Sequence, residues 1–165
     1  MSRAFVKEDA RSEAELVPPR APLPEGIANL VTPRGWRLLH EERDALSAER
    51  ARLDAAGGPV DAVEERLEAL LARIASAQVT SVDDQDGVVR FGSTVDVDVL
   101  GGPQPTTQRL TIVGVDEADP MAGRIAFVSP IGDALLGARV GDEVALDGAS
   151  ARHRWRVRAI VEPPG

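Results

Sequence analysis

Residues 129–137 read SPIGDALLG and residues 140–144 read VGDEV, and this stretch indicates the fold of the second half of the chain. Pro130 stiffens a loop. Three apolar residues then recur at the spacing of one helix face: Ile131, Leu135 and Leu136. Gly137 is typical of a helix end, and the alternation that begins at Val144 is typical of a strand. The stretch predicts a short helix, a turn and a strand, a unit found in many α+β domains.

Strand-like segments surround this unit. Six segments have strand character: 88–91, 94–99, 109–113, 125–128, 143–146 and 155–160. In one segment Val95, Val97 and Val99 alternate with aspartates, and in another Trp155, Val157 and Ala159 alternate with arginines. One buried face and one wet face are typical of an antiparallel sheet. We therefore expect residues 78–165 to form an antiparallel β-sheet domain with one short helix.

The segment 31–77 has helical periodicity. Thr32 is a candidate N-cap, and Pro33 suits a first helical position. Two apolar stripes follow, on either side of a Gly-Gly-Pro turn at 57–59: Trp36, Leu39, Leu46 and Leu53, then Val60, Val63, Leu67, Leu70, Ile74 and Ala77. This pattern predicts an antiparallel helical hairpin of the coiled-coil type. At helical rise its arms would extend roughly 35 Å and roughly 27 Å.

Composition limits the classes of function. The net charge is −8 and aromatic residues make up 3% of the chain, so clustered phosphate contacts and base-stacking platforms are disfavoured. An acidic chain better fits a protein partner with basic surfaces. The chain has no cysteine and no apolar run of membrane-spanning length. We expect a cytoplasmic monomer that does not bind nucleic acid sequence-specifically. Residues 1–30 are rich in proline and are expected to form an extended, disordered arm.

The quoted stretch resembles the C-terminal domain of the GreA/GreB transcription elongation factors, in which S-P-I-x-x-A-L-L-G precedes V-G-D-E-V. Shorter resemblances follow in the same order as in that family. They are a T-x-x-G-x-x-x-L-x-x-E opening from Thr32 to Glu42, A-Q-V at 77–79, F-G-S-T-V at 91–95 and D-E-A-D at 116–119. Together these matches cover most of residues 31–162.

The resemblance implies an α+β protein with an N-terminal coiled coil and an FKBP-like C-terminal domain. It implies that the C-terminal domain docks on RNA polymerase at the rim of the secondary channel, and that the hairpin enters the channel. The residues that would dock lie in two matched motifs: Asp116, Glu117, Asp119, Ser129, Pro130, Ile131, Gly132 and Leu135.

The hairpin tip carries the candidate chemistry. Asp61 and Glu64 resemble the D-x-x-E of the Gre tip. In cleavage-stimulating members, tip acids help hold a second Mg²⁺ that is shared with the polymerase, which then cuts its own backtracked transcript. The neighbouring residues do not match the family's D-L-K-E-N-A-E-Y, and both acids also suit the first turn of a helix. The hairpin is shorter than the family's, so a channel-occupying regulator of the Rnk type, which does not stimulate cleavage, is the alternative.

Other features are weighed against simpler explanations. Four arginines alternate along one strand: Arg152, Arg154, Arg156 and Arg158. They form either an ordinary wet sheet face or a basic patch for acidic helices of a partner. His40 and His153 lack the spacing of metal ligands. We expect no metal site, no stably bound cofactor and no enzymatic activity of the chain's own. A chaperone or prolyl isomerase is an alternative that rests on fold analogy.

Overall fold

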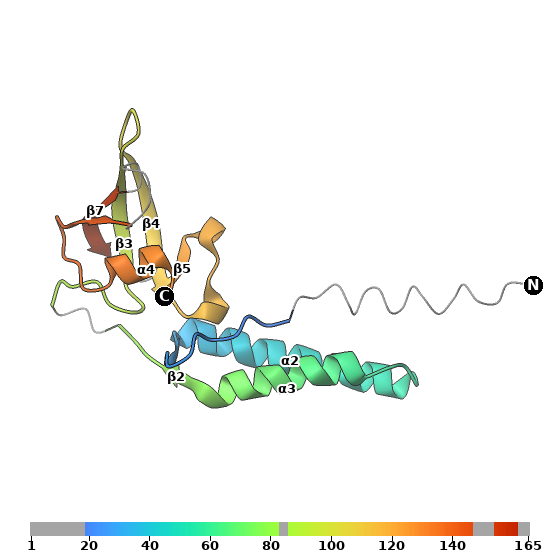
Figure 1. Ribbon diagram of the computed structural model, residues 1–165. Coiled ribbons are helices and arrows are strands. Elements are labelled where there is room, and N and C mark those ends of the chain that lie inside the picture. The colour runs from blue at the N-terminus through green and yellow to red at the C-terminus, as the bar shows by residue number, and fades with distance from the viewer. Residues whose placement is uncertain (1–18, 83–85, 147–153, 162–165) are drawn as a thin grey trace, which may run out of the picture. The chain divides into compact units, whose positions relative to one another are not determined.

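The computed structural model describes residues 19–82, 86–146 and 154–161 (Figure 1). The chain divides into two compact units. The helical unit comprises the chain up to Ile27 together with Leu38–Ser76, and the sheet unit comprises Ala28–Arg37 and the chain from Ala77 onward. Each unit is described by itself below. No helix in the described ranges combines the length and apolar character needed to cross a membrane.

Two helices make up most of the helical unit. Helix α2 spans Pro33–Ala55 and helix α3 spans Asp61–Ser76, which corresponds to about 35 Å and about 24 Å at helical rise. They lie side by side (Figure 1). Their packed stripe is nearly sealed from solvent: Leu39, Leu46, Val63 and Leu70 are each at most 4% exposed. The turn at 56–60 uses Gly57 at φ +66°, a conformation that glycine adopts without strain.

The segment that precedes the helices contacts both of them. Arg20 forms an ion pair with Glu42 of α2. The guanidinium of Arg73 in α3 donates a hydrogen bond to the Ala21 carbonyl. Further along, residues 29 and 30 belong to a strand. The predicted disordered arm therefore does not describe residues 19–30, and its remaining part, 1–18, lies outside the described residues.

The sheet unit is built on a five-stranded sheet of order β5-β4-β3-β7-β6. Its strands are β3 (Thr94–Leu100), β4 (Thr106–Val113), β5 (Arg124–Ala126), β6 (Glu143–Ala145) and β7 (Arg154–Val161). The pairings are antiparallel except between β4 and β5, which run parallel. The predicted purely antiparallel sheet is thus wrong. The connection through the 3-10 turns η1 (Val115–Glu117) and η2 (Pro120–Ala122) carries the chain back, so that β5 runs in the same direction as β4.

One predicted strand is absent. Residues 88–91 make a single bridge, from Val88 to Arg139, and no ladder. Val89 and Phe91 are nevertheless buried, at 1% and 8% exposure. These residues are apolar because the loop that carries them packs into the core. A short apolar run has the same pattern in a buried loop as in a strand, so the sequence did not separate the two.

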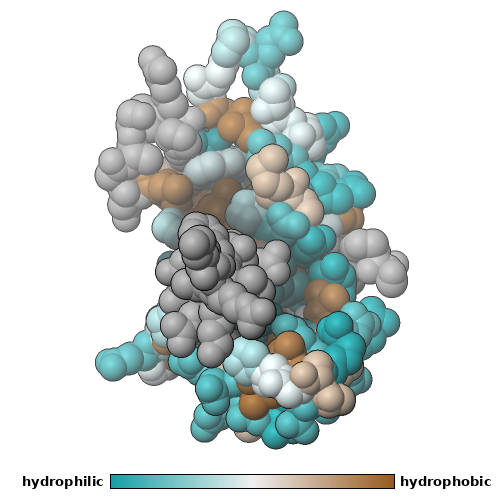
Figure 2. Space-filling model, turned by 90° about the vertical axis from the view of Figure 1, so that its right-hand side faces the viewer, coloured by the Kyte–Doolittle hydropathy of each residue, from teal (hydrophilic) through white to brown (hydrophobic). Residues whose placement is uncertain are grey.

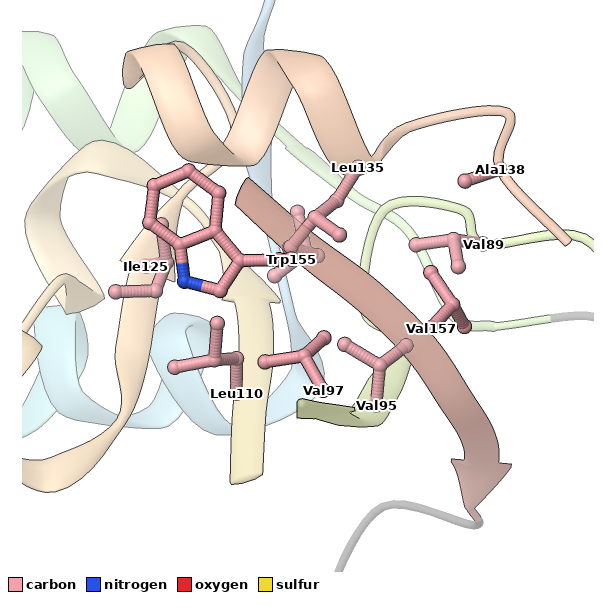
Figure 3. Packing of buried hydrophobic residues seen from close by; sticks show 10 residues of the cluster. Val89, Val95, Val97, Leu110, Ile125, Leu135, Ala138, Trp155 and Val157 are labelled. Atoms are coloured by element: carbon pink, nitrogen blue, oxygen red, sulfur yellow. The ribbon is translucent and has the colours of Figure 1, made fainter. Parts of the chain in front are cut away.

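The core lies between the sheet and helix α4, which spans Pro130–Leu135. Its centre is lined by strand residues together with two residues at the end of α4 and just beyond it: Val95, Val97, Leu110, Ile112, Trp155, Val157, Leu135 and Ala138. Figure 3 shows Leu135 projecting from the end of α4 toward Trp155 and Val157. The SPIGDALLG stretch at 129–137 therefore forms the helix that covers this core.

A bulge changes the predicted alternation of β7. Asp96 pairs with Ala159 while the next residue, Val97, pairs with Val157, so Arg158 is the extra residue. Beyond the bulge Ile160 packs against the core. Trp155 and Val157 face the core as predicted, but Ile160 replaces Ala159 as the next core-facing residue.

A second, two-stranded sheet was not predicted. Strand β1 (Asn29–Val31) immediately precedes α2, and strand β2 (Ala77–Val79) immediately follows α3. They pair in parallel, with Asn29 opposite Ala77 and Val31 opposite Val79. This β1–β2 neck belongs to the sheet unit and joins the two ends of the helical segment.

Candidate functional site

The two predicted tip acids lie at the start of α3. One is exposed to solvent, and the other forms an ion pair with α2. Asp61 opens α3 and is exposed, and Glu64 lies one turn later on the same helix. Glu64 Oε1 is 2.6 Å from Arg50 Nη2 of α2. The acid pair predicted from D-x-x-E thus shares a first helical turn, but the carboxylate of Glu64 is already engaged by a cation. Sequence reasoning missed this partner, although Arg50 interrupts the apolar stripe of α2.

The tip has few ligands to offer a shared Mg²⁺. Among the described residues no group of three or more His, Asp or Glu side chains could hold a metal ion. Mg²⁺ bound in company with phosphate needs only one or two protein carboxylates and keeps several waters. Asp61 fits that role as a single exposed carboxylate. Glu64 fits it only after it leaves Arg50.

Helix α4 and its N-cap contain five of the predicted docking residues, four of them in the helix, and these residues differ in accessibility. Ser129 is the N-cap: its Oγ accepts from the Gly132 N–H at 3.2 Å and donates to the Ala126 carbonyl at 2.7 Å. Pro130, at the first helical position, is exposed, and Ile131 is partly buried against the core. The surface that a partner could touch is therefore the N-terminal end of α4.

Gly132 and Leu135 have internal roles instead. A Cβ on Gly132 would lie 2.2 Å from the Ala126 carbonyl oxygen, so only glycine fits beside β5. Leu135 is completely buried. The expectation that these two residues dock directly on a partner is corrected: they hold α4 on the sheet and thereby position Pro130 and Ile131.

The three acids of the D-E-A-D loop differ in burial, and only Glu117 is buried. The Glu117 side chain is 4% exposed; it forms an ion pair with Arg34 at 3.0 Å and accepts a hydrogen bond from the Thr32 hydroxyl. Asp119 accepts from the Ala122 N–H as the N-cap of η2 and pairs with Arg124 at 3.0 Å. Asp116 is half-buried. Glu117 is thus not available for direct docking, and the T-x-x-G and D-E-A-D motifs, distant in sequence, meet in the structure.

The arginine strand lies on the wet face of the sheet, but acids neutralise it. Glu143 on the neighbouring strand pairs with both Arg154 and Arg156, and Asp98 lies 3.8 Å from Arg158. A fourth pair, between Arg109 and Asp96 at 2.8 Å, continues the pattern. The face is a lattice of alternating charges and not a purely basic patch; Arg152 lies outside the described residues.

These ion pairs shift the titration of their acids. The hydrogen bond from Arg109 holds the pKa of Asp96 below its ordinary value, and the charge of Arg158 acts in the same direction. Asp96 in turn raises the pKa of Arg109. The hydrogen bond from Arg156 similarly lowers the pKa of Glu143, with Arg154 contributing. In each case the folded state stabilises the charged form.

On the face shown in Figure 2, hydrophilic residues cover most of the visible described surface and hydrophobic residues form separate patches. Among the residues that the structure describes, the most exposed large apolar one is Met121 in η2, at 98%.

A pair of helices with acids in the first turn of α3, together with a mixed sheet that has a short capping helix, defines this chain as an α+β protein of two units. Residues 84–162 match the family described as transcription elongation factor, GreA/GreB, C-terminal. The transcription elongation factor GreA of Desulfovibrio desulfuricans is 38% identical over 150 residues, which is 79% of this chain and 91% of that protein. GreA of Rhodospirillum rubrum is 36% identical over 92% of this chain and 91% of its own length. The chain therefore belongs to the GreA/GreB family.

The prokaryotic transcription elongation factor GreA/GreB from Nitrosomonas europaea is 23% identical, and the comparison covers 81% of this chain and 98% of that one with a TM-score of 0.39. Family membership rests on the sequence relatives.

Proposed function

We propose that this protein binds RNA polymerase and acts on transcription elongation, with the sheet unit docking at the rim of the secondary channel and the helical hairpin entering it. The observation that carries the proposal is the turn between α2 and α3, where Asp61 is exposed at the start of a helix. Relatives named GreA match both units of the chain, which supports the same general role.

The exposed end of α4 is the proposed docking edge. Pro130 is exposed there, and the Ser129 cap and buried Leu135 fix its position. The alternating charges on the wet face of the sheet give a second surface that could pair with complementary charges. Gly132 packs so closely on β5 that a Cβ there would meet the Ala126 carbonyl oxygen, and this close packing supports α4 as a fixed docking edge.

At the tip, Asp61 would supply one carboxylate to a Mg²⁺ shared with the polymerase. Such an ion lowers the pKa of bound water and stabilises developing charge on phosphate oxygens. The role of this chain is to bring the carboxylate of Asp61 to the metal ion, with Glu64 one helical turn further along α3. In this proposal the polymerase performs the cleavage.

A second candidate is favoured by the ion pair between Arg50 and Glu64. With Glu64 engaged and α3 only about 24 Å long, the hairpin could occupy the channel and exclude other factors without stimulating cleavage. The two candidates share docking and differ only in what the tip does.

Transcript cleavage by a deliberately backtracked polymerase complex separates them. The unmodified chain, Asp61→Asn, and Asp61→Asn with Glu64→Gln would be compared in Mg²⁺ buffer, with Glu25→Gln as a control of equal charge change. Stimulation that falls with Asp61→Asn supports the cleavage proposal. Binding without stimulation supports channel occupancy. Stimulation that survives the double substitution would overturn the acidic-tip mechanism, and an absence of binding would overturn the function itself.

Several finer expectations stay predictions. They are the FKBP-like description of the sheet unit, the isomerase activity that it would suggest, the monomeric state, the cytoplasmic location and the lack of direct nucleic-acid binding. A proline-isomerisation assay on the full chain tests the isomerase alternative. If the rate does not exceed the background, the alternative is removed.

A further inference from the structure

Glu117 connects two distant segments of the sheet unit. It lies at the end of η1, and it contacts Thr32 and Arg34, which belong to the start of α2. We infer that Glu117 is a positioning residue that fixes the first turn of α2 on the sheet unit and so sets the freedom of the hairpin. Only the activity test of this inference rests on the proposed function.

The contacts of Glu117 divide between its two carboxylate oxygens. Oε1 is 3.0 Å from Arg34 Nη1, and Oε2 accepts the hydrogen bond from the Thr32 hydroxyl. The Thr32 Oγ1 also accepts from the Gly35 N–H at 2.9 Å, as an N-cap does. A single carboxylate therefore holds the side chain that caps α2, and its negative charge lies near the end of the helix where negative charge is favourable.

Two glycines allow the segments to come this close. A Cβ on Gly35 would lie 2.7 Å from Glu117 Oε2. A Cβ on Gly114, the N-cap of η1, would lie 2.4 Å from the Leu30 carbonyl oxygen. A larger residue at Gly114 would meet the backbone of β1 and move η1 away from it, whereas a larger residue at Gly35 would displace the carboxylate of Glu117 from its partners. The contact depends on both glycines, which is typical of a close backbone approach.

Burial makes the arrangement selective. The Glu117 side chain is 4% exposed, whereas Arg34 is 46% exposed. A buried carboxylate is costly unless its partners satisfy it, so Glu117 favours the one arrangement in which Thr32 and Arg34 are both in reach. If the carboxylate is removed, Arg34 returns to water at little cost, and the N-cap loses its support.

The consequence reaches the hairpin through the continuity of α2. Pro33–Arg37 belongs to the sheet unit, while the same helix from Leu38 onward belongs to the helical unit. Looseness in the first turn therefore becomes looseness between the units. The first turn of α2 is one of two connections between the units, the other being the return from α3 into β2, and Glu117 is the residue that holds the first of them.

The first test reads this freedom without polymerase. The chain has no cysteine, so Ala51→Cys on α2 and Gln108→Cys on β4, both exposed, give two unique spin-label sites. We expect Glu117→Gln to at least double the width of the distance distribution between the labels, while Glu25→Gln leaves it unchanged. A width that Glu117→Gln does not change would overturn the inference. A thermal melt of each variant checks that both units stay folded.

A second variant keeps every charge and hydrogen-bonding group. Gly35→Ala places a methyl group against Glu117 Oε2, and we expect it to broaden the distribution in the unmodified chain. In a Glu117→Ala background the carboxylate that the methyl group would meet is gone, so adding Gly35→Ala should not broaden the distance distribution further. Equal broadening by Gly35→Ala in both backgrounds would show that the two residues act separately, and would overturn the inference.

The activity test separates positioning from docking. With polymerase at saturating factor, we expect Glu117→Gln to reduce the effect on elongation at least fivefold while the Kd for polymerase changes less than twofold. Equal loss of binding and effect would overturn the positioning role. If the unmodified chain does not bind polymerase, the proposed function fails, whereas the label distances still decide whether Glu117 holds α2.

Discussion

Arg50 and Glu64 join the two helices one turn from the tip, with 2.6 Å between Arg50 Nη2 and Glu64 Oε1. Both side chains are close to half exposed, so the pair is an accessible contact and not a buried lock. Exposed ion pairs of this kind contribute roughly 0.2–1 kcal/mol. Arg50 therefore lowers the negative charge of the tip, but polymerase or a metal ion could displace it.

Replacing Arg50 tests this relationship. We expect Arg50→Gln to increase transcript cleavage at saturating factor by up to about fivefold, because up to roughly 1 kcal/mol that held Glu64 becomes available in the transition state. The measurement is the rate of cleavage in a backtracked complex. Arg52→Gln, the same charge change on an exposed residue of α2, is the matched control. An equal increase from both variants would show a general charge effect.

The packed stripe of the hairpin offers a neighbouring pair of leucines for comparison. Leu70 is completely buried, whereas Leu71 is 46% exposed. We expect Leu70→Ala to lower the free energy of unfolding of the helical unit by about 2–5 kcal/mol, and Leu71→Ala by less than about 0.5 kcal/mol. Urea unfolding followed by circular dichroism at 222 nm measures both. Equal losses would contradict the packing described here.

Close packing at Gly132 predicts a stability defect with a functional result. A Cβ there meets a backbone oxygen at 2.2 Å, so we expect Gly132→Ala to destabilise the sheet unit by about 1–3 kcal/mol and to weaken polymerase binding by displacing α4. Gly102→Ala is the control, since its nearest neighbour is 3.4 Å away. Thermal melting and a binding assay are the measurements. Normal stability of Gly132→Ala would contradict the tight fit.

The charge lattice predicts how stability depends on acidity. The folded-state pKa values of Asp96 and Glu143 are lowered by their arginines. Each carboxylate therefore contributes stability at pH values above its unfolded pKa, near 4, and that contribution is lost as the pH falls through the folded pKa. We expect Asp96→Asn with Glu143→Gln to flatten the loss of stability between about pH 5 and pH 2.

The measurement for this prediction is the urea midpoint across that pH range. Glu68→Gln, which removes an exposed carboxylate from α3, is the control and should follow the unmodified chain. The prediction is contradicted if the double variant and the unmodified chain lose stability in parallel as the pH falls.

Periodicity predicted the regular elements well. The stripes that contain Leu39 and Leu70 placed both helices to within about one residue of the bounds found, because helical spacing is a local signal. Five of the six predicted strands are present for the same reason. The bulge at Arg158 was not predicted, because it depends on how β7 pairs with β3 and not on the sequence of β7.

Contacts between distant segments could not be predicted. The neck strands are three residues each and carry no alternation long enough to detect. The sequence left open whether the arginines of β7 form an ordinary wet face or a basic patch, because their partner, Glu143, lies on another strand. The motif containing Glu117 was recognised but given a surface role, since burial by Thr32 and Arg34 is a property of the fold alone.

The pairing of β1 with β2 makes the helical segment an insertion. Asn29 lies opposite Ala77, so the chain leaves and re-enters the sheet unit at adjacent points. Hairpins of different lengths can be grafted onto such a base by adding or removing helical turns in both arms, while the host fold keeps its register. The number of helical turns then sets the reach of the helical segment, while the pairing of β1 with β2 is a mount that does not depend on that length.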